Sequence, residues 1–186
     1  AAEELGLASN PQWEEVARAI PILQFEDGLT RENATYAKGE MIKQADVNLL
    51  AFPMNIITDK DQVEKDLRYY ETVMDPRGPA MGFSVLSAIK ARLGNPNEAY
   101  DALVNAYRPN FVPPFNVIAE TAGGTNPYFA TGAGGVLQAV LGGFAGLEVT
   151  DKGITEQGAQ LPNHWKKLTI KGLGTDRQTV ILRNPN

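Results

Sequence analysis

Apolar residues recur at helical spacing over most of the chain, from residue 10 to residue 147. In "DKDQVEKDLRYYETVM" they stand three or four positions apart, at Val63, Leu67, Tyr70 and Met74. This spacing predicts an amphipathic helix with one buried stripe, on the outer side of the fold.

Two other segments are apolar around most of the helix. "AMGFSVLSAIKARLG" ends at Gly94, a good C-cap, and its pattern predicts a helix buried on two sides. "TGAGGVLQAVLGGFAGL" (131–147) is apolar nearly all round, so we expect it to be deeply buried. One-stripe helices thus alternate with nearly all-apolar helices, which indicates helical hairpins in two layers, packed as in a barrel.

Three more helices follow from the same reading, in "NPQWEEVARAI", "GEMIKQADVNLLAF" (39–52) and "NPNEAYDALVNAY". The first begins with Asn10 as N-cap and Pro11 at the first helical position. "AAEELGL" at the N-terminus reads as the last turn of a helix closed by Gly6, so we expect the chain to be part of a longer protein.

After Leu147 the period changes to alternation. "LEVTDKGI", "WKKLTIKGL" and "RQTVILRN" are rich in β-branched residues and are separated by "DKG" and "GTD" turns, which predicts short antiparallel strands. The predicted fold is therefore mainly α: a partial helical barrel over residues 1–147, then a small β segment over residues 148–186.

Composition narrows the function classes. The net charge is −5 and the pI is near 5.0, which argues against nucleic acid as a partner and favours a neutral or polar ligand. The chain has no cysteine and a single histidine, His164, expected at the surface, so we expect neither a metal site nor a cofactor. The apolar run from Val136 is too short to span a bilayer.

The segment "KQAD" carries the first candidate chemistry. Asp46 and Lys43 are three residues apart on the predicted helix and could form an ordinary surface ion pair. Alternatively, Lys43 and Gln44 bind a ligand together, which their angular separation on a helix allows only near a helix terminus or a pocket rim. The spacing leaves both interpretations open.

The connection from Arg108 to Thr131 is long and contains four prolines, which favours a positioned, functional loop. Its one carboxylate, Glu120, is the only acidic residue between Asp101 and Glu148. Glu120 could act as a general base or could cap the turn "ETAGG", and the residues leave this open. Four aromatic residues accompany it, and we expect them to anchor the loop to the core rather than to stack on sugars: Phe111, Phe115, Tyr128 and Phe129. "GAGG" (132–135) lacks the third glycine of a dinucleotide motif, so close helix packing is the better explanation.

Two segments resemble a known family. "YAKGEMIKQADVNLLAFP" and "FNVIAETAGGTNPYFATGAGGVLQAVLGGFAGLEV", followed by "LPNHWKKLTIKGLG", closely resemble the C-terminal part of glycoside hydrolase family 65. The family contains inverting α-glucoside hydrolases and phosphorylases. The resemblance implies the C-terminal half of an (α/α)6 barrel followed by antiparallel strands of a small C-terminal β domain.

The resemblance also implies roles for residues. It assigns glucose binding to Lys43 and Gln44, and it matches "AETAGGTNPYFATGAGG" to the hydrolase branch, in which Glu120 would be the general base. In a phosphorylase, the runner-up, Thr121, Thr125 and Thr131 with the glycine amides would bind phosphate. The family's general acid lies in a "GPDE"-like segment; "DPRGP" (75–79) lacks the glutamate, so the acid is expected upstream of residue 1.

The implied partners are an α-linked glucoside and the missing N-terminal part of the same enzyme, without nucleic acid or a membrane span. Kojibiose, trehalose or a glucosyl-galactose unit would be the substrate, and a periplasmic or secreted location is favoured over a cytoplasmic one. The alternative from another class is a non-catalytic sugar-binding or structural fragment.

Overall fold

The computed structural model describes residues 2–44, 46–150 and 152–184. The chain divides into two compact units, Ala1–Tyr36 and Ala37–Asn186, and each is described by itself. In the first unit, helix α1 (Pro11–Ala19) begins as predicted: the Asn10 side chain accepts a hydrogen bond of 3.0 Å from the Gln12 amide. The segment before it forms hydrogen-bonded turns that end at Gly6, where φ is +64°.

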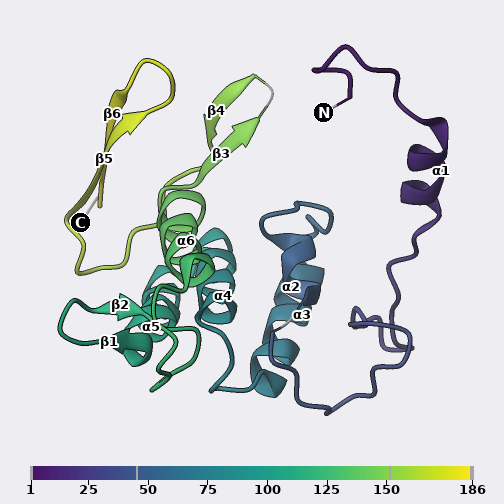
Figure 1. The fold of residues 1–186 in the computed structure, drawn as a ribbon, viewed down its shortest axis with the longest axis horizontal. Coiled ribbons are helices and arrows are strands. Elements are labelled where there is room, and N and C mark those ends of the chain that lie inside the picture. The colour runs from purple at the N-terminus through teal and green to yellow at the C-terminus, as the bar shows by residue number, and fades with distance from the viewer. Residues whose placement is uncertain (1, 45, 151, 185–186) are drawn as a thin grey trace. The chain divides into compact units, whose positions relative to one another are not determined.

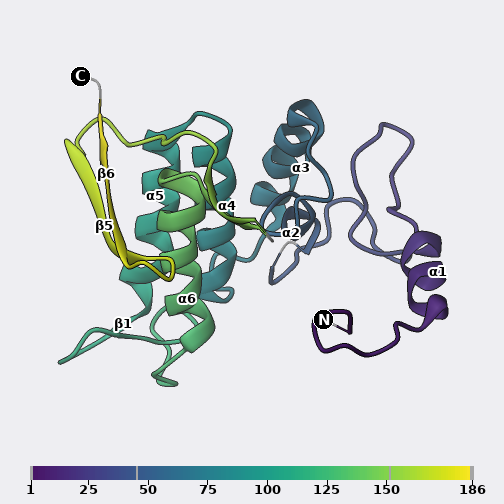
Figure 2. The same cartoon turned by 90° about the horizontal axis from the view of Figure 1, so that it is seen from above.

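The second unit carries the other helices. In chain order they are α2 (Asp46–Ala51), α3 (Lys60–Val73), α4 (Ala80–Arg92), α5 (Pro96–Tyr107) and α6 (Ala130–Gln138), which continues as a π-helix over Ala139–Phe144. Helix α4 lies between the α2–α3 pair on one side and α5 with α6 on the other, as both views show (Figures 1 and 2).

The predicted burial patterns hold for α3 and α4. Leu67 and Tyr70 of α3 are buried, as is Met74 at its end, whereas nine of the residues of α4 are buried around its circumference. One core cluster contains Leu67 and Met74 together with the apolar residues Leu86, Ala88, Ile89 and Ala91 of α4, and Phe52, Leu103, Phe144 and Leu161 belong to it as well.

The segment 131–147, which forms most of α6 and its π-helical continuation, was predicted to be deeply buried, and this is wrong for its first half. Ala133, Gly134, Leu137 and Gln138 are exposed, whereas the π-helical continuation is largely buried. The reason is that α6 packs on α4 through only one face, and its opposite face borders an open cavity.

Glycines set how closely α6 approaches α4. A methyl group added at Gly143 would lie 2.8 Å from Ala88 Cα, and one at Gly135 would overlap the Ser84 hydroxyl. Contacts between real Cβ atoms and backbone are essentially never this short, so the two helices meet nearly backbone to backbone. Within "GAGG" the interpretation as packing residues is confirmed for Gly132, which meets Phe129 and Ala80, and for Gly135, but not for Gly134, which has no atom within 4 Å of an added methyl group.

The helix predicted over residues 39–52 begins only at Asp46. The segment before it pairs with the end of α3 instead: the Ile42 amide donates to Val73 O at 2.9 Å, and the Asp75 amide donates to Ile42 O at 2.7 Å. Because these backbone groups are paired outside a helix, Lys43 and Gln44 lie in a bend just before α2.

Among the described residues of the second unit there are also three two-stranded antiparallel sheets. β3 (Leu147–Thr150) pairs with β4 (Gly153–Glu156), and β5 (Lys167–Leu173) pairs with β6 (Gln178–Arg183), as predicted. A short hairpin that the sequence reading missed, β1 (Phe111–Val112) with β2 (Val117–Ile118), lies within the long loop.

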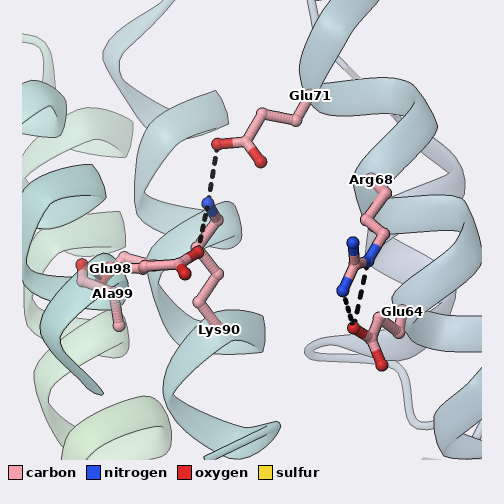
Figure 3. A network of polar contacts seen from close by, with 7 residues as sticks. Glu64, Arg68, Glu71, Lys90, Glu98 and Ala99 are labelled. Atoms are coloured by element: carbon pink, nitrogen blue, oxygen red, sulfur yellow. Dashed lines mark hydrogen bonds and ion pairs between the residues drawn. The ribbon is translucent and has the colours of Figure 1, made fainter. Parts of the chain in front are cut away.

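A lysine joins three helices. Lys90 of α4 has a side chain 11% exposed, and its ammonium group contacts Glu71 of α3 at 2.8 Å and Glu98 of α5 at 3.5 Å (Figure 3). The neighbouring pair Glu64–Arg68 stays within α3 and is largely exposed. The ion pairs of Lys90 therefore connect α4 with α3 and with α5, whereas the Arg68–Glu64 ion pair lies within α3.

The predicted fold class is confirmed: a helical array of the kind found in the C-terminal region of a helical barrel, followed by short antiparallel strands. The boundary expected between residues 147 and 148 stays a prediction. Within the described residues, no helix is both long enough and apolar enough to cross a bilayer.

Candidate active site

A cavity of about 930 Å³ opens along α2, α4 and α6. Its walls are mostly apolar, and polar and charged side chains interrupt them: Gln44, Asp46, Asn48, Asn55, Ser84, Arg92, Thr131, Gln138 and Glu148. Among the described residues, α3 and α5 contribute nothing to this lining. Helices α2, α4 and α6 are therefore the inner helices, and α3 and α5 are the outer ones, which agrees with the outer place that the apolar pattern predicts for α3.

Gln44 lines the cavity. Lys43, next to Gln44 in the chain, packs against the turn that follows α3. This turn, Asp75–Gly78, is closed by the Gly78 amide donating to Asp75 O at 2.8 Å, and the Lys43 carbonyl packs directly on Gly78. The segment "DPRGP" thus supports the "KQAD" segment. Lys43 itself is exposed.

Electrostatics at this turn favour a charged Asp75. The backbone N–H of Arg77 donates to Asp75 Oδ1 at 2.9 Å and is the main cause that lowers the pKa of Asp75 below its ordinary value, with smaller contributions from the charges of Arg77 and Lys43. An aspartate held ionised by a turn amide keeps that turn in place.

Glu120 is held by its backbone. Its carbonyl accepts hydrogen bonds from the Ala80 amide at 3.0 Å and from Asn110 Nδ2 at 3.1 Å, and Asn110 Nδ2 also donates to Ala119 O at 3.1 Å. The Glu120 side chain is exposed and makes no hydrogen bond within the described part of the chain. The turn after it is closed instead by the Gly124 amide on Thr121 O, so the turn-capping alternative for Glu120 finds no support.

The start of α4 brings these segments together. The Lys43 carbonyl packs against Gly78, two residues before α4. The amide of Ala80, the first residue of α4, donates a hydrogen bond to the Glu120 carbonyl. Gly132 of α6 approaches the same place, because a methyl group there would lie 3.1 Å from Ala80 Cβ. Three candidate segments far apart in sequence therefore meet at one end of the inner helices.

The aromatic residues of the loop do not all anchor it, which corrects the prediction. Phe111 packs on Tyr107 with ring centroids 5.2 Å apart, and Phe129 contacts Gly132. Phe115 and Tyr128, however, are 84% and 78% exposed. Tyr128 also has φ of +65°, a left-handed conformation that is costly for a bulky residue. The backbone hydrogen bonds described above hold the loop in place of these two rings.

No family model matches the chain. Among curated proteins it is 52% identical to kojibiose hydrolase of Mucilaginibacter mallensis over 184 residues, 98% of this chain and 27% of the relative. It is 39% identical to protein-glucosylgalactosylhydroxylysine glucosidase of Mus musculus over 83% of this chain and 22% of the relative. Cell wall acid trehalase of Arthroderma benhamiae is 28% identical over 99% of this chain and 20% of the relative.

The chain belongs to glycoside hydrolase family 65. This confirms the resemblance seen in the sequence. The chain spans about a quarter of the length of the curated relatives it matches, 27% of the kojibiose hydrolase.

In this family 65 chain, the three threonines expected to bind phosphate in a phosphorylase lie in different surroundings. Thr131 lines the cavity, Thr121 packs on Gly124, and Thr125 is exposed. His164 is exposed, as predicted, and its ring packs on Tyr100 with centroids 4.3 Å apart. Among the described residues, no group of His, Cys, Asp and Glu side chains could hold a metal ion.

The sequence reading missed two asparagines of this family 65 chain, Asn48 and Asn110, which are only 3% and 4% exposed. Both stand among apolar residues, in "DVNLLAF" and "YRPNFVPPF". For Asn48, a lone amide among apolar residues of a predicted helix was the available signal, because buried polar groups need a partner. Asn110 lies in the predicted loop, where the sequence gives no such signal.

Proposed function

We propose that this chain is the C-terminal part of an inverting α-glucoside hydrolase. Lys43 and Gln44 bind the glucose unit, and Glu120 is the general base. The observation that carries this assignment is the meeting of the "KQAD" turn, the Glu120 loop and the first turn of α6 around the start of α4, beside a cavity that Gln44 and Thr131 line.

In this proposal Glu120 removes a proton from a water molecule as the water attacks the anomeric carbon of glucose. The bond from that carbon to the glycosidic oxygen breaks, and a carboxylic acid on the opposite side protonates the leaving oxygen. Inverting enzymes keep their two carboxyl groups about 6.5–9.5 Å apart to admit the water. The acid is supplied by a part of the longer protein outside these 186 residues.

The substrate we propose is a glucose-containing disaccharide such as kojibiose or trehalose, or a glucosyl-galactose unit. The printed names of the relatives support this class: a kojibiose hydrolase, a glucosylgalactosylhydroxylysine glucosidase and an acid trehalase. The cell wall trehalase also supports a location outside the cytoplasm.

The test is the Glu120→Gln variant, made in the product of the complete open reading frame that contains this chain. Loss of a general base lowers kcat by about 10²–10⁴-fold, and KM should change little because the amide keeps the shape of the side chain. Glu156→Gln, an exposed glutamate on β4, is the matched control and should keep full activity. Full activity of Glu120→Gln would remove the assignment.

The product distinguishes the alternatives. NMR of the fresh reaction mixture should show β-glucose released without added phosphate. Strict dependence on phosphate would support a phosphorylase with Thr131 among its anion ligands. If the open reading frame contained no further helices and no acidic catalytic segment upstream, a non-catalytic sugar-binding fragment would be the better explanation.

A further inference from the structure

Asn48 is an anomaly in the burial pattern of α2. Its side chain is only 3% exposed, whereas the neighbouring Leu49 is 36% exposed. An amide buried in preference to a leucine is unfavourable unless its polar atoms find partners.

The other buried polar side chains of the second unit have partners. Hydrogen bonds or ion pairs are made by Asp66, Ser84, Ser87, Lys90 and Asn110. The Asn48 amide makes none within the described residues. No described polar side-chain atom that is fully enclosed lacks a partner. The amide oxygen and nitrogen of Asn48 must therefore open on the cavity that Asn48 lines.

We propose that Asn48 is a further ligand-binding residue, which holds a hydroxyl group of the sugar that Gln44 binds. Gln44 and Asn48 stand four positions apart, just before and within the first turn of α2, and both line the same cavity. A primary amide donates and accepts at once, which matches a sugar hydroxyl and suits a neutral ligand. This inference rests on the proposed function, because the sugar is the ligand of that site.

The decisive variant is Asn48→Leu, which keeps the number and branching of the side-chain heavy atoms and removes the amide. If Asn48 only fills space, removing an unpaired buried amide leaves the melting temperature unchanged or raises it and leaves catalysis unchanged. If Asn48 binds the sugar, the melting temperature behaves in the same way, but kcat/KM falls about 10-fold or more, mainly through KM. Asn48→Ala should give the same loss and serves if the leucine variant does not fold.

Ser87→Ala is the matched control. Ser87 is a buried polar side chain with a partner, its hydroxyl donating to Ala99 O at 2.7 Å, and it does not line the cavity. This variant should lose melting temperature and keep kcat/KM, the reverse of Asn48→Leu. Unchanged kcat/KM in both Asn48 variants overturns the inference.

A thermal-shift titration with D-glucose separates this inference from the proposed function, using the same complete protein. If the wild type hydrolyses no α-glucoside but D-glucose still raises its melting temperature, the hydrolase proposal fails. Loss of that shift in Asn48→Leu then supports the role of Asn48. If D-glucose, kojibiose and trehalose all leave the wild-type melting temperature unchanged, the inference on Asn48 fails as well.

Discussion

The side-chain Nδ2 of Asn110 donates to two successive carbonyls, those of Ala119 and Glu120, and the backbone carbonyl of Asn110 accepts from the Ala119 amide at 2.8 Å. It does not line the cavity. Its position is that of a residue that fixes where the Glu120 loop stands. A loop that carries a general base must hold the carboxylate close to the attacking water.

Asn110→Ala should therefore lower kcat more than it changes KM, by about 10-fold or more, because small displacements of a reacting group have large effects on rate. The freed carbonyls of Ala119 and Glu120 should also cost about 1–3 kcal/mol of unfolding free energy. Steady-state kinetics with kojibiose or trehalose and thermal denaturation measure the two effects.

Asn110→Asp separates shape from hydrogen bonding, since an ionised carboxylate keeps the shape but cannot donate. It should be at least as impaired as Asn110→Ala. Asn126→Ala, an exposed residue of the same loop, is the control and should behave as the wild type. A stability loss in Asn110→Ala with an unchanged kcat would leave it a structural residue only.

At the scale of single residues, the sequence pointed to candidate functional side chains but not to the contacts that surround them. The isolation of Glu120 and the pair Lys43–Gln44 could be read from neighbouring letters. The surroundings of Asn48 and Asn110 could not, because Asn48 lines a cavity and Asn110 donates to carbonyls nine and ten positions away.

Helix α6 shows why periodicity can be correct and burial still wrong. Its apolar residues predict a helix, and α6 with its π-helical continuation is one. An apolar helix face is expected to be shielded from water, but the pattern does not identify which part of the protein packs against that face. Here one face meets α4 and the other lines the cavity, so Leu137 is 63% exposed.

Two glycines of this segment give a matched pair of substitutions. Gly143→Ala places a methyl group against the Ala88 backbone, so the helices must move apart, and it should destabilise by about 1–3 kcal/mol. Gly134→Ala meets no atom within 4 Å and should be neutral or stabilising by up to about 1 kcal/mol, because alanine is the better helix former.

Chemical denaturation of both variants measures the difference. Equal unfolding free energies would mean that α4 and α6 are not in backbone contact. The segment before α2 illustrates the opposite limit of sequence-based prediction. Its residues suit a helix, but the backbone of Ile42 pairs with the end of α3, a contact that local propensity does not contain.

At the scale of the second unit, Lys90 joins α3, α4 and α5 through Glu71 and Glu98. The ammonium group is largely buried, whereas the Glu71 and Glu98 side chains are 41% and 69% exposed. Removing the Lys90 charge and removing the two glutamate charges should therefore change the unfolding free energy by different amounts.

Lys90→Met keeps the packing of the stem and leaves two carboxylates that water can solvate, so it should cost about 1 kcal/mol or less. The double variant Glu71→Gln/Glu98→Gln leaves a buried ammonium group without a counter-charge and should cost about 2 kcal/mol or more. Urea unfolding of both proteins checks the order. A larger loss in Lys90→Met would show that the ion pairs themselves stabilise the helical hairpins.

The alternation of inner and outer helices, and the change to strands after Leu147, could both be predicted from hydrophobic spacing. The hairpin β1–β2 could not, because each strand has only two residues and no period can be read from two positions. Which segments meet at the start of α4 also lay beyond the sequence, since those contacts join residues far apart in the chain.

The near contact between the α4 and α6 backbones also decides where this protein can be redesigned. A library meant to change which sugar enters the cavity gains little from varying Gly135 or Gly143, because larger residues there separate the two helices before they reshape the wall. Leu49 and Met81 line the same cavity with long, adaptable side chains. Under the proposed function, we therefore expect changes of substrate range first at Leu49 and Met81.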